Sequence, residues 1–430
     1  MSLGRQPTDR WLELEEGFVV ATGFECSAPV AAGGVRMDEL IKTGHWTRFA
    51  EDFDLVASFG IRALRYGLPF HVIARSDDPR DFNWRWTDTA LANLRDRGLE
   101  PILDLLHFGL PDDIPGMGDP RLVPRFEVFA REVAERYPWA RYYTPVNEPL
   151  VTAVLSALDG LWNERRRDER SFVAGIDSLV TCAIRGSEII RERSPDAIFI
   201  QSDACSSYQP LEPAAEERAR FHAEQGFVCW DLTYGRPLDP AVTRWLLDNG
   251  MSHERLDWFA EHGSSEGCIV GHDYYRGNEW LVGVTGRPRR AGPRRLGYLT
   301  LARQHSARYG LPFMISETNI AGNLAPSWLT EMWNAALALR DEGEPIRGIC
   351  WYGFVDHVDW DSGLTRDRGR VNRCGLVSLD RRPHRVGQMF CELARAASSG
   401  RLERLPVRAR PGAAPPPEEA AAAPIASQLG

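Results

Sequence analysis

Short apolar runs alternate along the chain with longer segments in which apolar residues recur every three or four positions. The short runs are rich in β-branched and aromatic residues, which favours β-strands, and the longer segments have the period of amphipathic helices. The predicted strands are Phe18–Glu25, Ile61–Leu68, Glu100–Leu106, Tyr142–Asn147, Ala197–Ser202, Gly267–Asp273, Pro312–Glu317 and Arg347–Tyr352. The predicted helices are Trp46–Phe59, Thr87–Arg97, Pro124–Arg136, Ser171–Arg193, Ala214–Phe227, Leu296–Tyr309 and Pro326–Glu342.

This alternation of strands and helices predicts an α/β fold, a closed (β/α)8 TIM barrel that forms a single domain over residues 1–400. Gly60, Gly98 and Gly310 each follow a helical pattern, where a left-handed helix cap is expected. A doubly wound open sheet is the alternative. The chain contains nothing that resembles a G-x-G-x-x-G segment or a phosphate-binding P-loop, so the barrel is favoured.

The two ends of the chain differ from the predicted barrel. Residues 401–430 contain the run Pro-Gly-Ala-Ala-Pro-Pro-Pro-Glu-Glu, which cannot bury a core, so a disordered Pro/Ala-rich tail is predicted. Residues 1–16 lack the apolar stretch of a secretion signal, and no run elsewhere is long enough to span a membrane. We therefore expect a cytoplasmic protein with no membrane partner.

The charge of the chain narrows the classes of partner and of chemistry. A formal net charge of −9 argues against nucleic acid as a partner. Lys42 is the only lysine, which disfavours barrel aldolases because they need a Schiff-base lysine at a strand end. The basic segment Gly286–Arg295 is interpreted as a solvated surface loop, and contact with an anionic group of a ligand is the less favoured alternative.

The cysteines do not indicate a metal site. They show no C-x-x-C pair and no zinc spacing, and several lie in apolar runs, so reduced and buried thiols are expected. No metal and no cofactor are predicted. The eight cysteines are Cys26, Cys182, Cys205, Cys229, Cys268, Cys350, Cys374 and Cys391.

A glutamate stands at the end of the fourth predicted strand and another at the end of the seventh. Glu148 follows the fourth strand, directly before Pro149, and Glu317 ends the seventh. Residues at the carboxyl ends of barrel strands carry the chemistry of these folds, and either glutamate alone could be an ordinary loop carboxylate. Two at matching strand ends face each other, as in retaining glycosidases, whose carboxyl groups lie roughly 5 Å apart. One is kept protonated to assist the leaving group, and the other is ionised and attacks the anomeric carbon.

The chain resembles a divergent member of glycoside hydrolase family 1, within the wider clan of barrels whose catalytic glutamates lie on strands 4 and 7. The resemblance extends from about Phe18 to Leu379. It implies a retaining, β-glucosidase-like hydrolase of small glycosides or oligosaccharides, with Glu148 as acid/base and Glu317 as nucleophile. The segments that carry it, in the order of the family, are Ala21–Gly23, Leu64–Tyr66, Leu99–Pro111, Thr144–Pro149, Asp273–Tyr275, Ile315–Glu317, Asp356–Trp360 and Cys374–Val377.

Further residues are predicted to bind the substrate or to tune the glutamates. Arg65 would be a fixed cation near Glu317 that favours its ionised form, or else a structural ion pair inside the barrel. Asn147 can donate to a sugar 2-hydroxyl. The resemblance implies that Tyr275, otherwise a core residue, orients the nucleophile. His107 is interpreted as a hydroxyl-binding residue, with a core histidine as the alternative. Trp351, Tyr352 and Trp360 are interpreted as an aromatic floor under a sugar ring or as simple packing.

The departures from the family pattern concern the sugar pocket, so the specificity of a standard β-glucosidase is not expected. No phosphate-binding pattern follows Trp360, which disfavours a phosphorylated sugar. The changed positions are Glu25 or Cys26 for the pocket glutamine, Asp359 for the pocket glutamate, Asp273 for the asparagine before the tyrosine pair, Phe108 for the tryptophan after the strand 3 histidine, and Tyr352 for the strand 8 tryptophan.

Three other functions are compatible with parts of the pattern. A metal-dependent barrel hydrolase needs a His-x-His at the first strand end, where this chain has Glu25 and Cys26. A non-catalytic carbohydrate-binding barrel would explain the altered pocket, but it leaves the pair of glutamates without a role. A transglycosidase shares the covalent intermediate, and the sequence does not separate it from a hydrolase.

Overall fold

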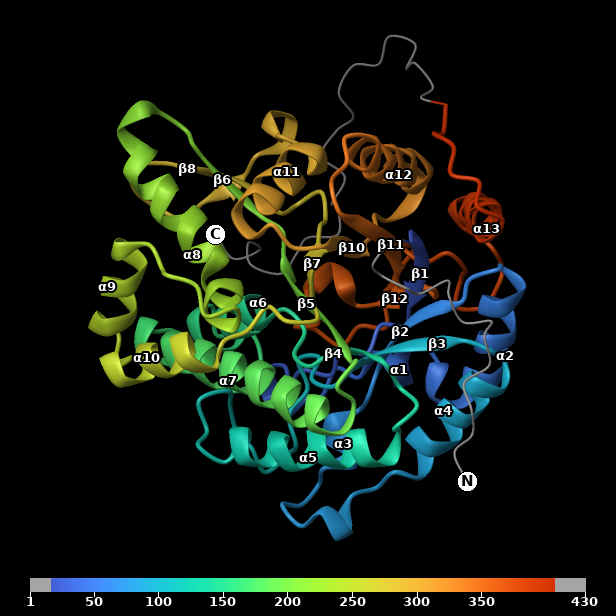
Figure 1. Cartoon of the computed structure of the whole chain (residues 1–430), viewed down its shortest axis with the longest axis horizontal. Helices are drawn as coiled ribbons and strands as arrows, with labels where there is room; N and C mark the ends of the chain where they lie inside the picture. The colour runs from blue at the N-terminus through green and yellow to red at the C-terminus, as the bar shows by residue number, and fades with distance from the viewer. Residues whose placement is uncertain (1–16, 407–430) are drawn as a thin grey trace.

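The computed structural model describes residues 17–406, and its centre is a closed barrel of eight parallel strands (Figure 1). The predicted (β/α)8 barrel and all eight of its strands are confirmed, and the open-sheet alternative is wrong because β1 pairs with β11 and closes the sheet. The barrel strands are β1 (Val19–Gly23), β2 (Ala63–Gly67), β3 (Glu100–Asp104), β4 (Tyr142–Thr144), β5 (Ile198–Ala204), β7 (Cys268–Asp273), β10 (Phe313–Thr318) and β11 (Ile346–Tyr352).

Helices surround the barrel, and all seven predicted helices are confirmed to within a few residues at most ends. The helix predicted to end at Phe227 continues to Thr233. The helices Pro240–Asp248, His253–His262 and Arg385–Ser398 were not predicted. Gly60, Gly98 and Gly310 have φ values of 78°, 65° and 62°, as expected for left-handed caps. The larger helices are α2 (His45–Ser58), α4 (Arg85–Asp96), α5 (Leu122–Arg136), α7 (Glu169–Arg193), α8 (Glu216–Thr233), α11 (Tyr298–Tyr309), α12 (Ala325–Asp341) and α13 (Arg385–Ser398). The shorter ones are α1 (Glu39–Lys42), α3 (Phe70–Ile73), α6 (Pro149–Ala153), α9 (Pro240–Asp248) and α10 (His253–His262).

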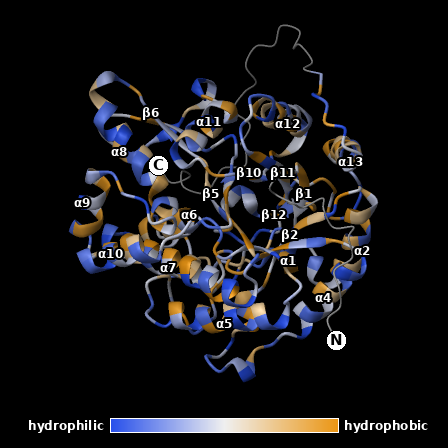
Figure 2. Cartoon of the chain, in the orientation of Figure 1, coloured by the Kyte–Doolittle hydropathy of each residue, from blue (hydrophilic) through white to orange (hydrophobic). Residues whose placement is uncertain are grey.

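The alternation of side chains along each strand divides the interior into two apolar layers. On β2, Ala63 belongs to the cluster inside the barrel, and Leu64 belongs to the larger core between strands and helices. Figure 2 shows hydrophobic residues along the strands and on the inner sides of the helices, with hydrophilic residues toward solvent. Because the period of a strand is two residues, Arg65 points into the barrel like Ala63.

Two small sheets lie among the loops that follow the barrel strands. The three-stranded sheet contains β6 (Ser207–Pro210), β8 (Glu279–Val282) and β9 (Arg289–Arg290), and the other pairs β12 (His357–Val358) with β13 (Val371–Asn372). The basic segment Gly286–Arg295 includes β9. Most of its arginines are exposed, as predicted, but the Arg290 guanidinium lies over the Trp280 ring, 3.9 Å from its centroid.

The described chain ends along α12. Residues 401–406 form no helix or strand, and the backbone of Leu405 exchanges two hydrogen bonds of 2.8 Å with the side chain of Asn334. The rest of the predicted tail, residues 407–430, and the N-terminal segment 1–16 lie outside the described residues. None of the described helices combines the length and the apolar composition needed to cross a membrane.

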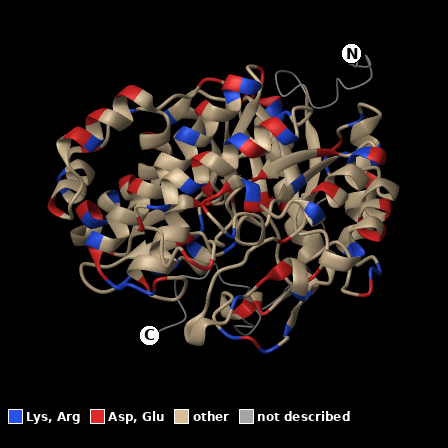
Figure 3. Ribbon diagram, turned by 90° about the horizontal axis from the view of Figure 1, so that it is seen from below, with Lys and Arg blue, Asp and Glu red and all other residues tan. Residues whose placement is uncertain are grey.

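The surface carries residues of both charges, and the thiols are buried as expected. Acidic and basic residues are interspersed along the outer helices, mostly without a large region of one sign (Figure 3). All eight cysteines are free, and seven of them are buried; Cys391 is half-buried.

Candidate active site

Glu148 is delivered by the turn between β4 and α6. The Glu148 N–H donates to the carbonyl of Ser202 at 3.1 Å, and Pro149 is the first residue of α6, where a missing N–H costs nothing. Glu148 has φ 38° and ψ 61°, a left-handed conformation that non-glycine residues seldom adopt. Strain of this kind clusters at functional sites, and here the glutamate is buried at the strand end.

Glu317 reaches the same end of the barrel because β10 contains a bulge. The pairing with β7 runs from Ile315↔His272 to Glu317↔Asp273, so two steps on β10 match one step on β7. Regular alternation would place Glu317 on the outer face with Ile315. The bulge instead lets Ser316 and Glu317 both reach groups inside the barrel, which is how bulges re-aim side chains beside active sites.

Arg65 connects the two glutamate-bearing strands. Its Nη1 donates to Glu317 Oε1 at 2.5 Å, and its Nη2 donates to Asp104 Oδ2 at 3.1 Å, to Ser202 Oγ at 3.0 Å and to Asn147 Oδ1. The guanidinium is only 2% exposed. A planar, permanently charged group with several donors can bond carboxylates on two strands together with the neighbouring amide and hydroxyl oxygens, which lysine could not do.

The pKa values of the two glutamates are driven apart by their surroundings. Burial raises the pKa of Glu317, but the Arg65 guanidinium opposes this, as does the Tyr275 hydroxyl, which donates to Glu317 Oε2 at 2.7 Å. Burial raises the pKa of Glu148 much further, and the negative charges of Asp273 and Glu317 add to the rise. Glu148 therefore holds its proton more tightly than Glu317 does, and a separation of this kind is typical of an acid and a nucleophile.

Two further carboxyl groups lie beside the pair, and neither was among the predicted site residues. Asp273 accepts from Ser316 Oγ at 2.6 Å, and burial raises its pKa well above the usual range. Asp203 accepts from the Leu150 N–H at 2.9 Å, and burial raises its pKa to about 7. Asp203 lies within β5, and no motif in the sequence pointed to it. Asp273 was visible only as a departure from the family pattern.

The residues predicted to bind the substrate partly converge on His107. Its Nδ1 lies 2.9 Å from Asp104 Oδ2 and its Nε2 lies 3.0 Å from Asn147 Nδ2, so a proton on Nδ1 leaves Nε2 as the acceptor. Glu25 Oε1 is 3.7 Å from His107 Nε2. The carboxylate of Glu25 is held by Ser27, whose backbone N–H donates at 2.9 Å and whose hydroxyl donates at 2.5 Å.

His357 completes this group, although it was not among the predicted site residues. The Gly353 N–H donates to His357 Nε2 at 3.1 Å, so the proton of the neutral ring is on Nδ1. That Nδ1 lies 3.9 Å from Glu25 Oε2. Both atoms are buried and have no hydrogen-bond partner among the described residues. A ligand hydroxyl between them could accept from His357 and donate to Glu25.

Tyr352 and Trp360 occupy different places at the site. The Tyr352 ring lies nearly parallel to His107 at a centroid distance of 5.9 Å, and its hydroxyl donates to the Phe24 carbonyl at 3.0 Å. Tyr352 is buried and belongs to the apolar cluster inside the barrel. Trp360 is partly exposed and meets the His357 ring edge-on at 5.4 Å. Both rings therefore contact histidines of the proposed sugar pocket.

Asp359 was predicted to bind the substrate, but its carboxylate bonds a loop of the protein itself. It accepts hydrogen bonds of 2.8–2.9 Å from the backbone N–H groups of residues 368, 369 and 370. Lys42 Nζ lies 2.9 Å from its Oδ2. These contacts fix the loop between β12 and β13. They also give Lys42, the only lysine of the chain, a structural role.

Cys26, Asp104 and His107 could together hold a metal ion, since one ligand atom of each lies within 4.8 Å of the others. The Cys26 thiol is also 3.5 Å from the Tyr352 hydroxyl. Asp104 Oδ2 already bonds both Arg65 and His107. An ion at this place would compete with Arg65 for Asp104. The three residues are therefore better explained as part of the hydrogen-bond network around Arg65.

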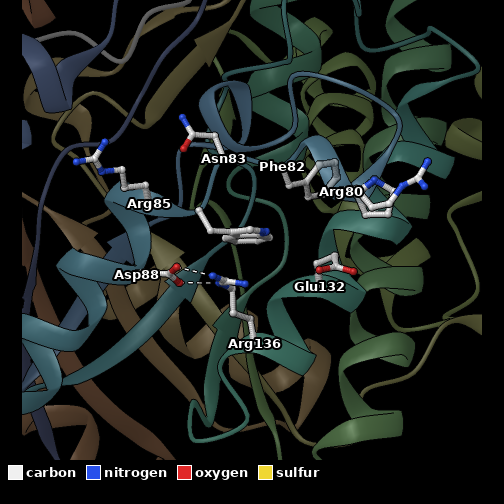
Figure 4. A pocket seen from close by; sticks show the side chains of 9 residues that line it. Arg80, Phe82, Asn83, Arg85, Asp88, Glu132 and Arg136 are labelled. Carbon is white, nitrogen blue, oxygen red and sulfur yellow. Dashed lines mark hydrogen bonds and ion pairs between the residues drawn. The ribbon is translucent and has the colours of Figure 1, made fainter.

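A polar depression on the outer helical layer is separate from the glutamates (Figure 4). It lies between α5 and the segment that leads into α4, and an ion pair of Arg136 with Asp88 crosses it, with Nε to Oδ1 at 2.6 Å. None of the predicted site residues lines it. Its arginines are exposed or already paired, and it offers no group arranged for catalysis.

The relatives and structural neighbours of this chain are β-glucosidases. No protein-family model matches the chain. Its sequence is 24% identical to β-glucosidase A of Thermotoga maritima over 162 residues, which is 35% of each protein, so the chain spans about a third of that relative's length in this match. It is 20% identical to the aryl-phospho-β-D-glucosidase BglC of Bacillus subtilis over 392 residues, 77% of this chain and 81% of that one.

The solved structure of a family 1 β-glucosidase from Thermotoga maritima shares the fold, with a TM-score of 0.74 over 89% of this chain and 98% of that chain at 15% identity. The castanospermine complex of the Thermotoga maritima β-glucosidase gives a TM-score of 0.75, over 90% of this chain and 99% of that one at 17% identity. The resemblance to glycoside hydrolase family 1 is thus confirmed for the fold.

Proposed function

We propose that the protein is a retaining β-glycosidase that hydrolyses an O-glycosidic bond of a small glycoside or oligosaccharide. The observation that carries this proposal is the contrast between two buried glutamates at the ends of β4 and β10. Glu317 is held by Arg65 and Tyr275, whereas no cation of residues 17–406 forms an ion pair with Glu148, whose pKa is strongly raised. The β-glucosidase fold and relatives support the same assignment.

In the first step, a carboxylate oxygen of Glu317 attacks the anomeric carbon, and Glu148 gives its proton to the departing glycosidic oxygen. The sugar is then an ester of Glu317. In the second step, Glu148, now ionised, takes a proton from water, and the resulting hydroxide displaces Glu317. The two inversions give overall retention, and Glu148 ends protonated as it began.

The surroundings of the glutamates suit the charge that develops. Arg65 remains paired with one oxygen of Glu317, while Tyr275 bonds the other, so the nucleophile is held in one orientation before substrate arrives. Both contacts strengthen again as Glu317 leaves and regains its negative charge. Asn147 lies between Arg65 and His107, and it is the candidate contact for the 2-hydroxyl of the sugar.

Glu25 and His357 offer a site for one hydroxyl of the glycone. Glu25 and the Nδ1 proton of His357 form an acceptor and donor pair, and a single equatorial or axial hydroxyl placed between them satisfies both. A sugar that lacks this hydroxyl would leave two buried polar atoms unpaired. Sites built in this way reject such analogues strongly. We therefore propose that hydroxyl recognition by Glu25 and His357 selects the glycone.

The experiment that tests the proposal is covalent trapping with a panel of 2-deoxy-2-fluoro glycosyl fluorides. The expected result is a mass increase of one glycosyl unit per chain for at least one sugar, with peptide mapping to Glu317. The matched control is Glu317→Gln, which should bind the same sugar without being labelled. Binding of glycans with no label for any sugar would instead favour a non-catalytic carbohydrate-binding barrel.

Hydrolysis and transglycosylation diverge only after the trapped state. Release of the labelled enzyme should be timed in water alone and with added sugar acceptors. A hydrolase recovers activity in water at a rate that acceptors alter little, and a transglycosidase depends on them. We propose hydrolysis because the similar proteins are named as β-glucosidases.

A further inference from the structure

Cys205, His272 and His305 meet on the outer face of the barrel, away from the glutamates. Cys205 follows β5, His272 lies in β7 and His305 lies in α11. One ligand atom of each residue lies within 4.8 Å of the other two. The three side chains are at most 2% exposed. No two of them are close in sequence, so the cluster exists only because β5 and β7 are neighbours under α11.

The hydrogen bonds within the cluster leave lone pairs unused. Cys205 Sγ lies 3.6 Å from His305 Nε2, and His272 Nδ1 lies 3.0 Å from the Tyr298 hydroxyl. His272 Nε2 and His305 Nδ1 are buried without a hydrogen-bond partner among the described residues. His272 has the arrangement of a metal-binding histidine, in which one ring nitrogen is bonded to an oxygen and the other is available to an ion. His305 presents its Nε2 to the Cys205 sulfur.

Aromatic rings enclose the cluster. The His305 ring centroid lies 5.0 Å from that of Phe227 and 5.1 Å from that of Trp230, and Phe313 stacks on His272 at 5.1 Å. Burial lowers the pKa of His305 to about 3 and lowers the pKa of His272 well below its usual range. The rings and the burial of the three side chains keep solvent away from the cluster.

We propose that Cys205, His272 and His305 bind one copper(I) ion. Thiolate and imidazole are ligands that a soft d10 ion prefers. A Cu(I) thiolate with two neutral imidazoles carries no net charge, which suits an aromatic enclosure. Zn(II) would leave one positive charge there, and structural zinc takes four ligands where this cluster offers three. On binding, the Cys205 thiol gives its proton to solvent as the sulfur–copper bond forms.

The ion would join α11 to two adjacent barrel strands. The Cys205 N–H donates to the carbonyl of Asp273 at 3.0 Å, and β7 carries Asp273 at its end, directly before the segment that contains Tyr275. Copper at this place would therefore stabilise the strand that supports the nucleophile without touching the substrate. Its role is structural, and glycosidase activity is not the readout that tests it.

The test is anaerobic titration of the reduced full-length protein with Cu(I) in the presence of a chromogenic Cu(I) chelator. We expect one equivalent bound per chain, an X-ray absorption spectrum with one sulfur and two nitrogen ligands, and a rise in unfolding temperature with added Cu(I). Cys205→Ser and His305→Gln should each lose the bound equivalent and the rise. The spectrum and the temperature shift of the wild type decide the matter even if a variant folds poorly.

Two control variants fix the location of the ion. Cys182→Ser removes another buried thiol, on α7, and should keep the bound equivalent. Cys26→Ser removes the thiol of the cluster beside His107, and it should also keep it. Loss of binding in Cys26→Ser but not in Cys205→Ser would overturn the proposal. Absence of bound Cu(I), or tighter binding of Zn(II) than of Cu(I) at Cys205, would overturn it as well.

Discussion

Arg65 Nη1 lies 2.5 Å from Glu317 Oε1, and both side chains are buried inside the mouth of the barrel. Arg65 is fixed on β2, three strands away from β10 around the barrel, so the pair spans the opening in which a substrate would bind. The same guanidinium bonds Asn147, the residue before Glu148. One cation thus sets the position of the nucleophile and of the segment that carries the acid.

Arg65→Lys should impair the nucleophile while keeping a positive charge. A lysine cannot bond Glu317, Asp104 and Asn147 together, so the pKa of Glu317 should rise. We expect kcat/KM to fall about 10²-fold, the size of effect seen when one preorganised donor is removed. The acidic limb of the pH profile of kcat/KM should move to higher pH, since ionised Glu317 is required. An unchanged limb would contradict the assignment of Arg65.

Glu317→Ala should abolish turnover, with a loss on the order of 10⁴-fold or more, because no other carboxylate can form the covalent intermediate. Added azide should restore activity toward substrates with good leaving groups. Because azide enters in one displacement, the glycosyl azide formed should have the inverted anomeric configuration, which NMR spectroscopy of the product measures. Rescue with retention, or substantial activity without azide, would show that Glu317 is not the nucleophile.

Glu148→Gln should discriminate between substrates by their leaving groups. Hydrolysis of an alkyl glycoside, whose departing oxygen needs a proton, should slow by about 10²–10⁴-fold. The first step with a dinitrophenyl glycoside should be little affected, because that leaving group departs unaided. Pre-steady-state kinetics with both substrates measures the difference. Full activity on the alkyl glycoside would remove Glu148 from the role of acid.

Asp273→Asn should lower the pKa of Glu148. Burial raises that pKa most, and the negative charge of Asp273 is the next contribution, which a neutral amide of the same shape removes. Glu148 must be protonated for the first step, so the basic limb of the pH profile of kcat/KM should move to lower pH. Asp273 and Glu148 titrate as an interacting group, and the profile reports their combined behaviour. Asp96→Asn, at the exposed end of α4, serves as the control and should leave the limb in place.

Asp359→Asn should affect stability more than catalysis. The carboxylate holds three backbone N–H groups and the Lys42 ammonium, and hydrogen bonds to charged groups contribute about 1.5–3 kcal/mol. Burial raises the pKa of Asp359, but the Arg370 N–H and Lys42 outweigh it and lower the pKa. A lowered folded pKa gives stability that is present above the unfolded value of about 3.9 and is lost as the pH falls through the folded value.

Urea unfolding of the wild type and of Asp359→Asn at several pH values tests this. The two free energies of unfolding should differ most near pH 7 and converge below about pH 4. KM for the trapped glycone should change little. A large rise in KM with unchanged stability would instead place Asp359 in contact with the sugar, as its sequence position had suggested.

The sequence by itself determined the barrel, its eight strands and the two glutamates. Strand and helix periods are local properties, and Glu148 and Glu317 each stand at the end of an apolar run, so both could be located without knowledge of any contact. The resemblance to glycoside hydrolase family 1 then gave the two residues different roles.

Only the tertiary structure decided what surrounds them. The bulge that turns Glu317 inward and the left-handed turn at Glu148 depend on pairing between strands distant in sequence. Asp359 matched a family position, but the loop at 368–370 captures its carboxylate because backbone N–H groups there need an acceptor. His357 and Cys205 carried no spacing signal, since their partners come from other strands and helices. Burial and pairing are properties of the folded chain, and they decide which of its many polar residues take part in catalysis or binding.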